Sequence, residues 1–190
     1  AAQLSRPYGV ALDEEGGLLY VADADNHAIR VVDLGANGTL STVAGTLGSG
    51  GRAGDGDPAT AAQLYFPTGV ALDAQARHLY VADNWNHAVR LVDLATGLMT
   101  TLTGVLGLHG RAGDGGRAEW ARLQLPTGIA MDVPNRRLYI ADSGNSAIRV
   151  VGVTDDVRSN FTGVGLEGSS APRPPAGHMK RPPPGPYFFT

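Results

Sequence analysis

Three segments of the chain repeat one another without gaps, and this repeat constrains the fold more than any other feature. They read RPYGVALDEEGGLLYVADADNHAIRVVDL, FPTGVALDAQARHLYVADNWNHAVRLVDL and LPTGIAMDVPNRRLYIADSGNSAIRVVGV. The equivalent prolines, Pro7, Pro67 and Pro126, lie 60 and then 59 positions apart. A fixed period of this length is typical of architectures in which each unit buries its apolar face against the next unit.

Each repeat contains several short runs of β-forming residues. In the first repeat the runs are Gly9–Asp13, Leu18–Asp23, Ala28–Leu34 and Leu40–Gly45, and Met99–Gly104 is the second copy of the last run. They are rich in Val, Ile, Tyr and Thr and are separated by Gly, Asp and Asn, which favours strands joined by tight turns. The connections are short enough for hairpins, so each repeat predicts a four-stranded antiparallel meander.

Runs such as LYVA are almost continuously apolar, which is typical of strands covered on both faces. Small sheets of this kind that repeat along a chain predict the blades of a β-propeller. The 27 glycines among 190 residues agree with a turn-rich, all-β fold.

The pattern Pro-x-Gly-Val-Ala-x-Asp, Leu-Tyr-Val-Ala-Asp and Asn-His-x-x-Arg closely resembles the NHL repeat. The resemblance covers residues 1 to about 163 and implies a β-propeller, often six-bladed, with the GVALD strand innermost. The third copy departs from this pattern, because Ser146 stands where the other copies have His27 and His87.

The repeats divide the chain into a propeller segment, residues 1–163, and a tail, residues 164–190. We expect blades at about 6–45, 66–104 and 125–163, joined by inter-blade loops at 46–65 and 105–124. The chain opens with AAQL, which recurs at Ala61–Leu64 before the second blade, and this indicates a partial propeller from a larger one. Seven of the twelve prolines lie between Pro172 and Pro186, so we expect a disordered, proline-rich tail.

Acidic, amide and guanidinium side chains recur at the turn between the second and third strands. Asp and Asn accept hydrogen bonds from turn amides, and the Arg on the returning strand is placed to pair with the Asp. Recurrence in every blade favours a structural role, and the alternative is a ring of Arg or Asn side chains that contacts a ligand. The residues concerned are Asp23, Asp83 and Asp142, Asn26, Asn86 and Asn145, and Arg30, Arg90 and Arg149.

The motif GRAGDG occurs at Gly51–Gly56 and at Gly110–Gly115, between blades. A phosphate-binding P-loop is excluded, because no G-x-x-x-x-G-K-[ST] pattern is present. Calcium is not favoured, because the second copy has Gly116 where the first has Asp57. The motif predicts a strap between adjacent blades in which Asp55 and Asp114 cap turn amides.

No nucleophile constellation and no thiolate site is present, since the chain has no Cys and no G-x-S-x-G. We therefore predict a non-catalytic scaffold that binds a protein partner, without metal or cofactor, and with self-association through open blade edges as a hypothesis. Two alternatives stay open: an enzyme resembling propeller lyases and lactonases, with a central metal held partly by missing blades, and an RNA-binding platform. The net charge of −3 argues against the second alternative. No signal peptide or membrane-spanning run is evident, and the compartment stays undetermined.

Overall fold

The computed structural model describes residues 3–35, 38–153 and 164–166. Its first sheet contains β1 (Pro7–Asp13), β2 (Leu18–Asp23), β3 (Ala28–Asp33) and β4 (Thr39–Ala44). The second contains β5 (Pro67–Asp73), β6 (His78–Asp83), β7 (Ala88–Asp93) and β8 (Met99–Thr103). The third contains β9 (Pro126–Asp132), β10 (Arg137–Asp142), β11 (Ala147–Gly152) and β12 (Val164–Leu166).

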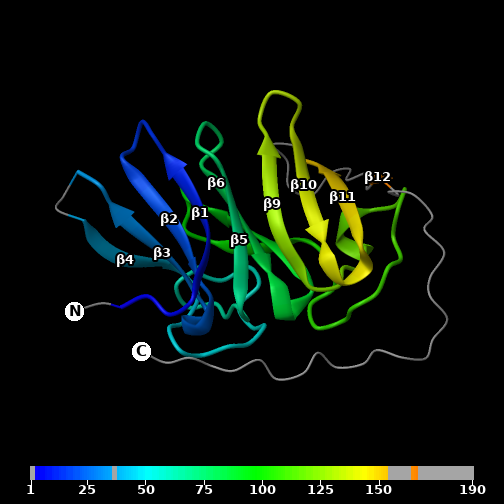
Figure 1. Ribbon diagram of the computed structural model, residues 1–190, viewed down its shortest axis with the longest axis horizontal. Helices are drawn as coiled ribbons and strands as arrows, with labels where there is room; N and C mark the ends of the chain where they lie inside the picture. Colours follow the sequence, from blue (N-terminus) through cyan, green and yellow to red (C-terminus); the bar gives the residue numbers. More distant parts are fainter. Residues whose placement is uncertain (1–2, 36–37, 154–163, 167–190) are drawn as a thin grey trace, which may run out of the picture.

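Each sheet is an antiparallel meander whose strands pair in sequence order. The first strand of the second sheet, β5, contacts both β1 and β9, and Figure 1 shows the three sheets side by side. This confirms the predicted all-β fold of three four-stranded propeller blades. We call the sheets blades 1, 2 and 3.

The two ends of each blade differ. The 3₁₀ turns η1 (Ala24–Asn26), η2 (Asn84–Asn86) and η4 (Ser143–Asn145) connect the second strand of each blade to the third. A fourth 3₁₀ turn, η3 (Ala118–Trp120), lies in the second inter-blade loop. We call the end formed by η1, η2, η4 and the inter-blade loops the loop face. It lies at the bottom of Figure 1, opposite the turns that join β1 to β2, β5 to β6 and β9 to β10.

Two apolar clusters hold the blades together. The first lies between blades 1 and 2, where Tyr20 and Ile29 pack near Leu79 and Val81. The second lies between blades 2 and 3, where Tyr80 and Leu91 belong to one cluster with Leu138, Ile140 and Val151. Blade 2 is therefore covered on both faces, as its continuous apolar runs predict.

The strand boundaries agree with the sequence analysis to within two residues in blades 1 and 2. In blade 3 the end of the expected blade, residues 154–163, lies outside the described residues, and the structure places the last strand, β12, at Val164–Leu166, within the segment that the sequence analysis assigns to the tail. The remainder of the predicted tail, residues 167–190, also lies outside the described residues.

Candidate functional site

A buried carboxylate organises the loop-face end of each blade. In blade 2, Asp83 Oδ1 accepts a hydrogen bond from the Tyr65 amide at 2.7 Å. Its Oδ2 accepts from Asn86 Nδ2 at 2.8 Å and from Arg90 Nη1 at 3.3 Å. The same set recurs as Asp23 with Ser5, Asn26 and Arg30, and as Asp142 with Gln124, Asn145 and Arg149.

All three carboxylates are fully buried, and Asp83 lies in blade 2, which has a neighbouring blade on each side. Burial raises its pKa to about 6, although the Arg90 charge and the hydrogen bonds from Asn86, Tyr65 and Arg90 act in the opposite direction. Desolvation of the Asp83 carboxylate thus outweighs its attraction to Arg90, as can happen for charges buried away from water.

The repeated Arg and Asn side chains are directed into the protein. Arg30, Arg90 and Arg149 are buried, and each forms the ion pair with its Asp that the repeat pattern predicts. Asn86 Nδ2 also donates to the Gly51 carbonyl at 2.6 Å, which ties the inter-blade loop to the 3₁₀ turn. A buried guanidinium that is bonded to a carboxylate is poorly placed for a ligand at the surface.

The GRAGDG segments connect to this network. Asp55 Oδ1 accepts from Arg90 Nη2 at 3.1 Å and from the Thr101 hydroxyl at 3.0 Å. Asp114 forms the equivalent ion pair with Arg149 Nη2 at 2.7 Å. The described contacts of both carboxylates are with side chains, whereas the sequence analysis expects turn amides. Each GRAGDG segment therefore ties its inter-blade loop to the blade that follows in the chain.

The histidine that follows the turn Asn connects neighbouring blades. His27 and His87 both adopt positive φ, and the Nδ1 atom of each accepts a hydrogen bond from the next blade. The donors are the Phe66 amide and the Leu125 amide, each at 3.2 Å. We call this contact the imidazole latch. Burial and the nearby His109 lower the pKa of His87, against a smaller opposite effect from Asp142.

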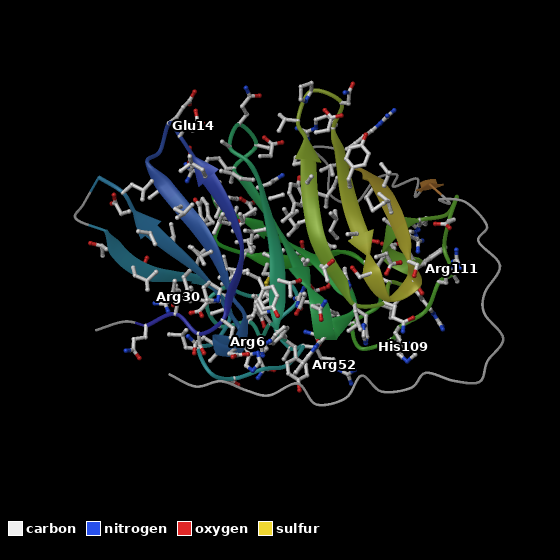
Figure 2. The ribbon with its side chains drawn as sticks, in the orientation of Figure 1. Arg6, Glu14, Arg30, Arg52, His109 and Arg111 are labelled. Carbon is white, nitrogen blue, oxygen red and sulfur yellow. The ribbon has the colours of Figure 1, made fainter. Side chains whose placement is uncertain are left out.

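Exposed aromatic rings gather on the loop face where blades 1 and 2 meet. The Phe66 ring stacks on Trp85 with centroids 4.7 Å apart, and Tyr8 and Tyr65 pack edge-on against Phe66 and Trp85 respectively. The Arg6 guanidinium carbon lies 5.2 Å from the Phe66 ring centroid. We call these five residues the aromatic surface, and Figure 2 places Arg6 at the loop face.

Three of these rings are well exposed although they are large and apolar. The exposed fractions are 54% for Tyr8, 46% for Trp85 and 38% for Tyr65. Arg6 also pairs with Asp25 at 3.4 Å, so the surface has a charged rim. An apolar patch with a polar rim is typical of an interaction site.

No metal centre is evident in the described part of the chain, since no three His, Asp or Glu side chains there are grouped so that they could hold an ion. Within the same residues, no helix is long and apolar enough to cross a membrane.

Comparison with known proteins identifies the repeat. The family model named NHL repeat matches three segments, residues 4–32, 64–90 and 123–151. The chain contains three NHL repeats. It is 31% identical over 182 residues to Protein SUPPRESSOR OF QUENCHING 1, chloroplastic, of Arabidopsis thaliana, covering 93% of the chain and 17% of that protein. It is 30% identical to NHL repeat-containing protein 2 of Bos taurus, covering 84% of the chain and 22% of that protein.

The chain thus spans about a fifth of the length of these curated relatives. Among solved structures it is similar to an auxiliary nutrient binding protein from Bacteroides ovatus, with a TM-score of 0.62 and 25% identity. That match covers 77% of the chain and 37% of the bacterial protein.

The three NHL repeats also show which residues are not required by the fold. The second blade junction has Gln124, Leu125 and Gly144 at the positions of Tyr65, Phe66 and Trp85 at the first junction. Since the second junction forms without aromatic rings at these positions, packing of an NHL blade does not require them. This surface was not predicted from the sequence. It could have been predicted from the difference between Tyr65, Phe66 and Trp85 and the residues at the equivalent positions of the third repeat.

Proposed function

We propose that the chain is a non-catalytic NHL-repeat module that binds a protein partner through the aromatic surface. The observation that carries this proposal is the exposure of Tyr8, Tyr65 and Trp85 at the junction between blades 1 and 2. The junction between blades 2 and 3 has no aromatic residues at the positions of Tyr65 and Trp85. Tyr, Trp and Arg are the residue types most enriched among residues that dominate protein–protein binding energy.

The repeated polar residues support the same proposal indirectly. The carboxylates Asp23, Asp83 and Asp142 are saturated by contacts within the blades, and their partner guanidinium groups are buried. These groups therefore serve the fold, whereas Tyr8, Tyr65 and Trp85 of the aromatic surface are exposed to a partner.

Site-directed photo-crosslinking tests the proposal on the whole chain. A benzophenone amino acid replaces Trp85 on the loop face, and a matched variant carries it at Gln75, which lies in the turn between β5 and β6 at the opposite end. The proposal expects a protein adduct from extract of the native source at position 85 and none at position 75. Equal adducts at both positions, or no adduct at position 85, would overturn it.

Two further readouts separate the alternatives. An adduct at position 85 that disappears with ribonuclease would identify RNA as the partner and would replace a protein partner. Stoichiometric metal in the purified protein would favour a catalytic centre over a non-catalytic module.

A further inference from the structure

The proline-rich motif RPPPGP, residues 181–186, has no part in the blades or in the proposed function. Residues 167–180 separate it from β12, the last described strand. Consecutive prolines favour the polyproline II conformation, which has no internal hydrogen bonds and leaves its rings and carbonyl groups exposed. Segments of this kind bind grooves that are lined with aromatic rings. The motif therefore suits an exposed cluster of aromatic side chains.

The aromatic surface has the side chains that such a segment requires. Its exposed Tyr65 and Trp85 rings meet edge to face, with centroids 4.9 Å apart and an angle of 85° between the ring planes. Two rings at a steep angle form a corner against which a pyrrolidine ring packs. The Tyr hydroxyl and the Trp indole N–H are donors for the carbonyl groups of a polyproline backbone.

Tyr65 and Trp85 are exposed although blades are described on both sides of them. Tyr65 lies in the first inter-blade loop and Trp85 in η2, at the junction of blades 1 and 2. Their exposure is therefore not that of an unpaired blade face. The Phe66 ring, which stacks on Trp85, is buried and supports the indole from within the junction.

The strand β12 directs the chain that follows it towards the loop face. It pairs antiparallel with β11, with Val164 opposite Val150 and Leu166 opposite Ile148. Since β11 begins at Ala147, shortly after η4, the Leu166 end of β12 is its loop-face end. The loop face also carries the aromatic surface, at the bottom of Figure 1.

Residues 167–180 are long enough to connect β12 to the aromatic surface. At about 3.1 Å per residue, these residues span about 43 Å in an extended conformation. Crossing blade 3 from its outer to its inner strand takes three strand spacings of about 4.8 Å, and neighbouring sheets lie about 10 Å apart. The path from β12 to the junction of blades 1 and 2 is thus about 30 Å long, which is within this span.

We propose that residues 181–186 of this chain dock on the aromatic surface of the same molecule. A linked segment acts at an effective concentration in the millimolar range, so weak intrinsic binding is enough to cover the surface. The docking does not require a partner. Its consequence rests on the proposed function: a protein that binds the aromatic surface must first displace residues 181–186, which act as an internal competitor.

A spin label in the full chain tests the docking. The chain has no Cys, so Met179→Cys gives a single site for a nitroxide next to residues 181–186. The two tryptophans, Trp85 and Trp120, each give one indole N–H signal, and Trp85→Phe assigns them. The nitroxide should broaden the Trp85 signal more than the Trp120 signal. An undocked segment would favour Trp120, because the second inter-blade loop leads directly into blade 3.

Substitution of the consecutive prolines tests which part of the segment docks. Replacing all three with alanine in the full chain should abolish the extra broadening at Trp85, because the rings that pack on the aromatic surface are lost. This triple variant is Pro182→Ala, Pro183→Ala and Pro184→Ala. The matched control, Pro174→Ala with Pro175→Ala, changes prolines nearer to β12 and should leave the broadening unchanged.

Partner crosslinking separates the docking from the proposed function. With benzophenone at position 85, the triple variant should give more partner adduct than the chain with its prolines intact, because the internal competitor is lost. Broadening at Trp85 without a partner adduct in either chain would contradict the proposed function and support the docking.

The docking proposal fails if the nitroxide broadens the Trp85 and Trp120 signals equally, or broadens Trp120 more. It also fails if the triple variant keeps the broadening at Trp85, or if the matched control loses it as well. A mixture of spin-labelled chains without ¹⁵N and unlabelled ¹⁵N chains should show no broadening. Broadening in that mixture would place the segment on another molecule and would overturn docking within one chain.

Discussion

At the scale of single residues, the repeated polar side chains act as internal connections. Each repeated carboxylate accepts hydrogen bonds from a backbone amide of the preceding loop, from the Asn side chain of the same turn and from the Arg side chain of the returning strand. The Arg–Asp pairs could be predicted from the sequence, because both partners lie within one hairpin. The imidazole latch could not, because His27 and its donor Phe66 are 39 residues apart and meet only when blades pack.

The raised pKa of Asp83 gives the protein a stability that depends on pH. Its pKa of about 6 in the folded state exceeds the ordinary Asp value of 3.8, so the folded state retains a proton between these pH values that the unfolded state has lost. This contribution is complete below pH 3.8 and is lost as the pH rises through about 6, by on the order of 2–3 kcal/mol. The carboxyl ¹³C shift of Asp83 should titrate with a midpoint near 6, and a midpoint below 4 would contradict this assignment.

The latch at His87 should respond to pH in the opposite direction. Its Nδ1 accepts a hydrogen bond and must be unprotonated, and its pKa in the folded state lies below the ordinary His value of 6.5. The contribution is therefore present above pH 6.5 and is lost as the pH falls through the folded pKa. His87→Ser, which copies the residue of blade 3, should cost about 1 kcal/mol at pH 7.5 in urea unfolding and less at pH 5.

His109→Ala is the control for that measurement. It removes the neighbouring ring and retains the latch, so the free energy of unfolding at pH 7.5 should stay close to that of the unmodified chain. Equal stability of His87→Ser and the unmodified chain at pH 7.5 would show that the latch contributes nothing.

At the scale of the blade, the sequence predicts most of the structure. The run Leu18–Asp23 is a strand with the same bounds, because alternating turn residues and apolar runs fix the hairpins locally. The strand β1 begins at Pro7, two residues before the expected start, since the inner strand continues past an irregular pairing between Pro7 and Val10. The position of the last strand of blade 3, β12, could not be predicted from the sequence, because this part of blade 3 departs from the sequence of the other two blades.

The inner-strand glycines give a prediction about the junctions between blades. Gly69→Ala should lower the free energy of unfolding by more than about 2 kcal/mol, because its methyl group would overlap a backbone carbonyl that cannot move freely. Gly128→Ala, the same change in an uncovered blade, should stay within about 0.5 kcal/mol. Urea unfolding of the Gly69→Ala and Gly128→Ala variants measures both changes in the free energy of unfolding. Equal losses of stability in the two variants would contradict the close approach at Gly69.

At the scale of the whole molecule, the same fold presents two kinds of surface. In the described part of the chain, one face of blade 1 and one face of blade 3 are uncovered, and both have the apolar residues that pack between blades elsewhere in the repeat. The aromatic surface departs from the repeat and suits a partner that is not a blade. Its residues come from both blades 1 and 2, so it exists only when the junction between them is formed.

Under the proposed function, residues outside the repeat pattern bind the partner, whereas residues within it hold the blades together. The most direct test is the Kd of the partner identified by crosslinking, measured for Trp85→Ala and for Trp120→Ala, an exposed tryptophan of the second inter-blade loop. Trp85→Ala should raise the Kd about 30-fold, as loss of a dominant interface residue does, with little change in Tm. Trp120→Ala should leave the Kd unchanged. An unchanged Kd for Trp85→Ala would contradict the claim.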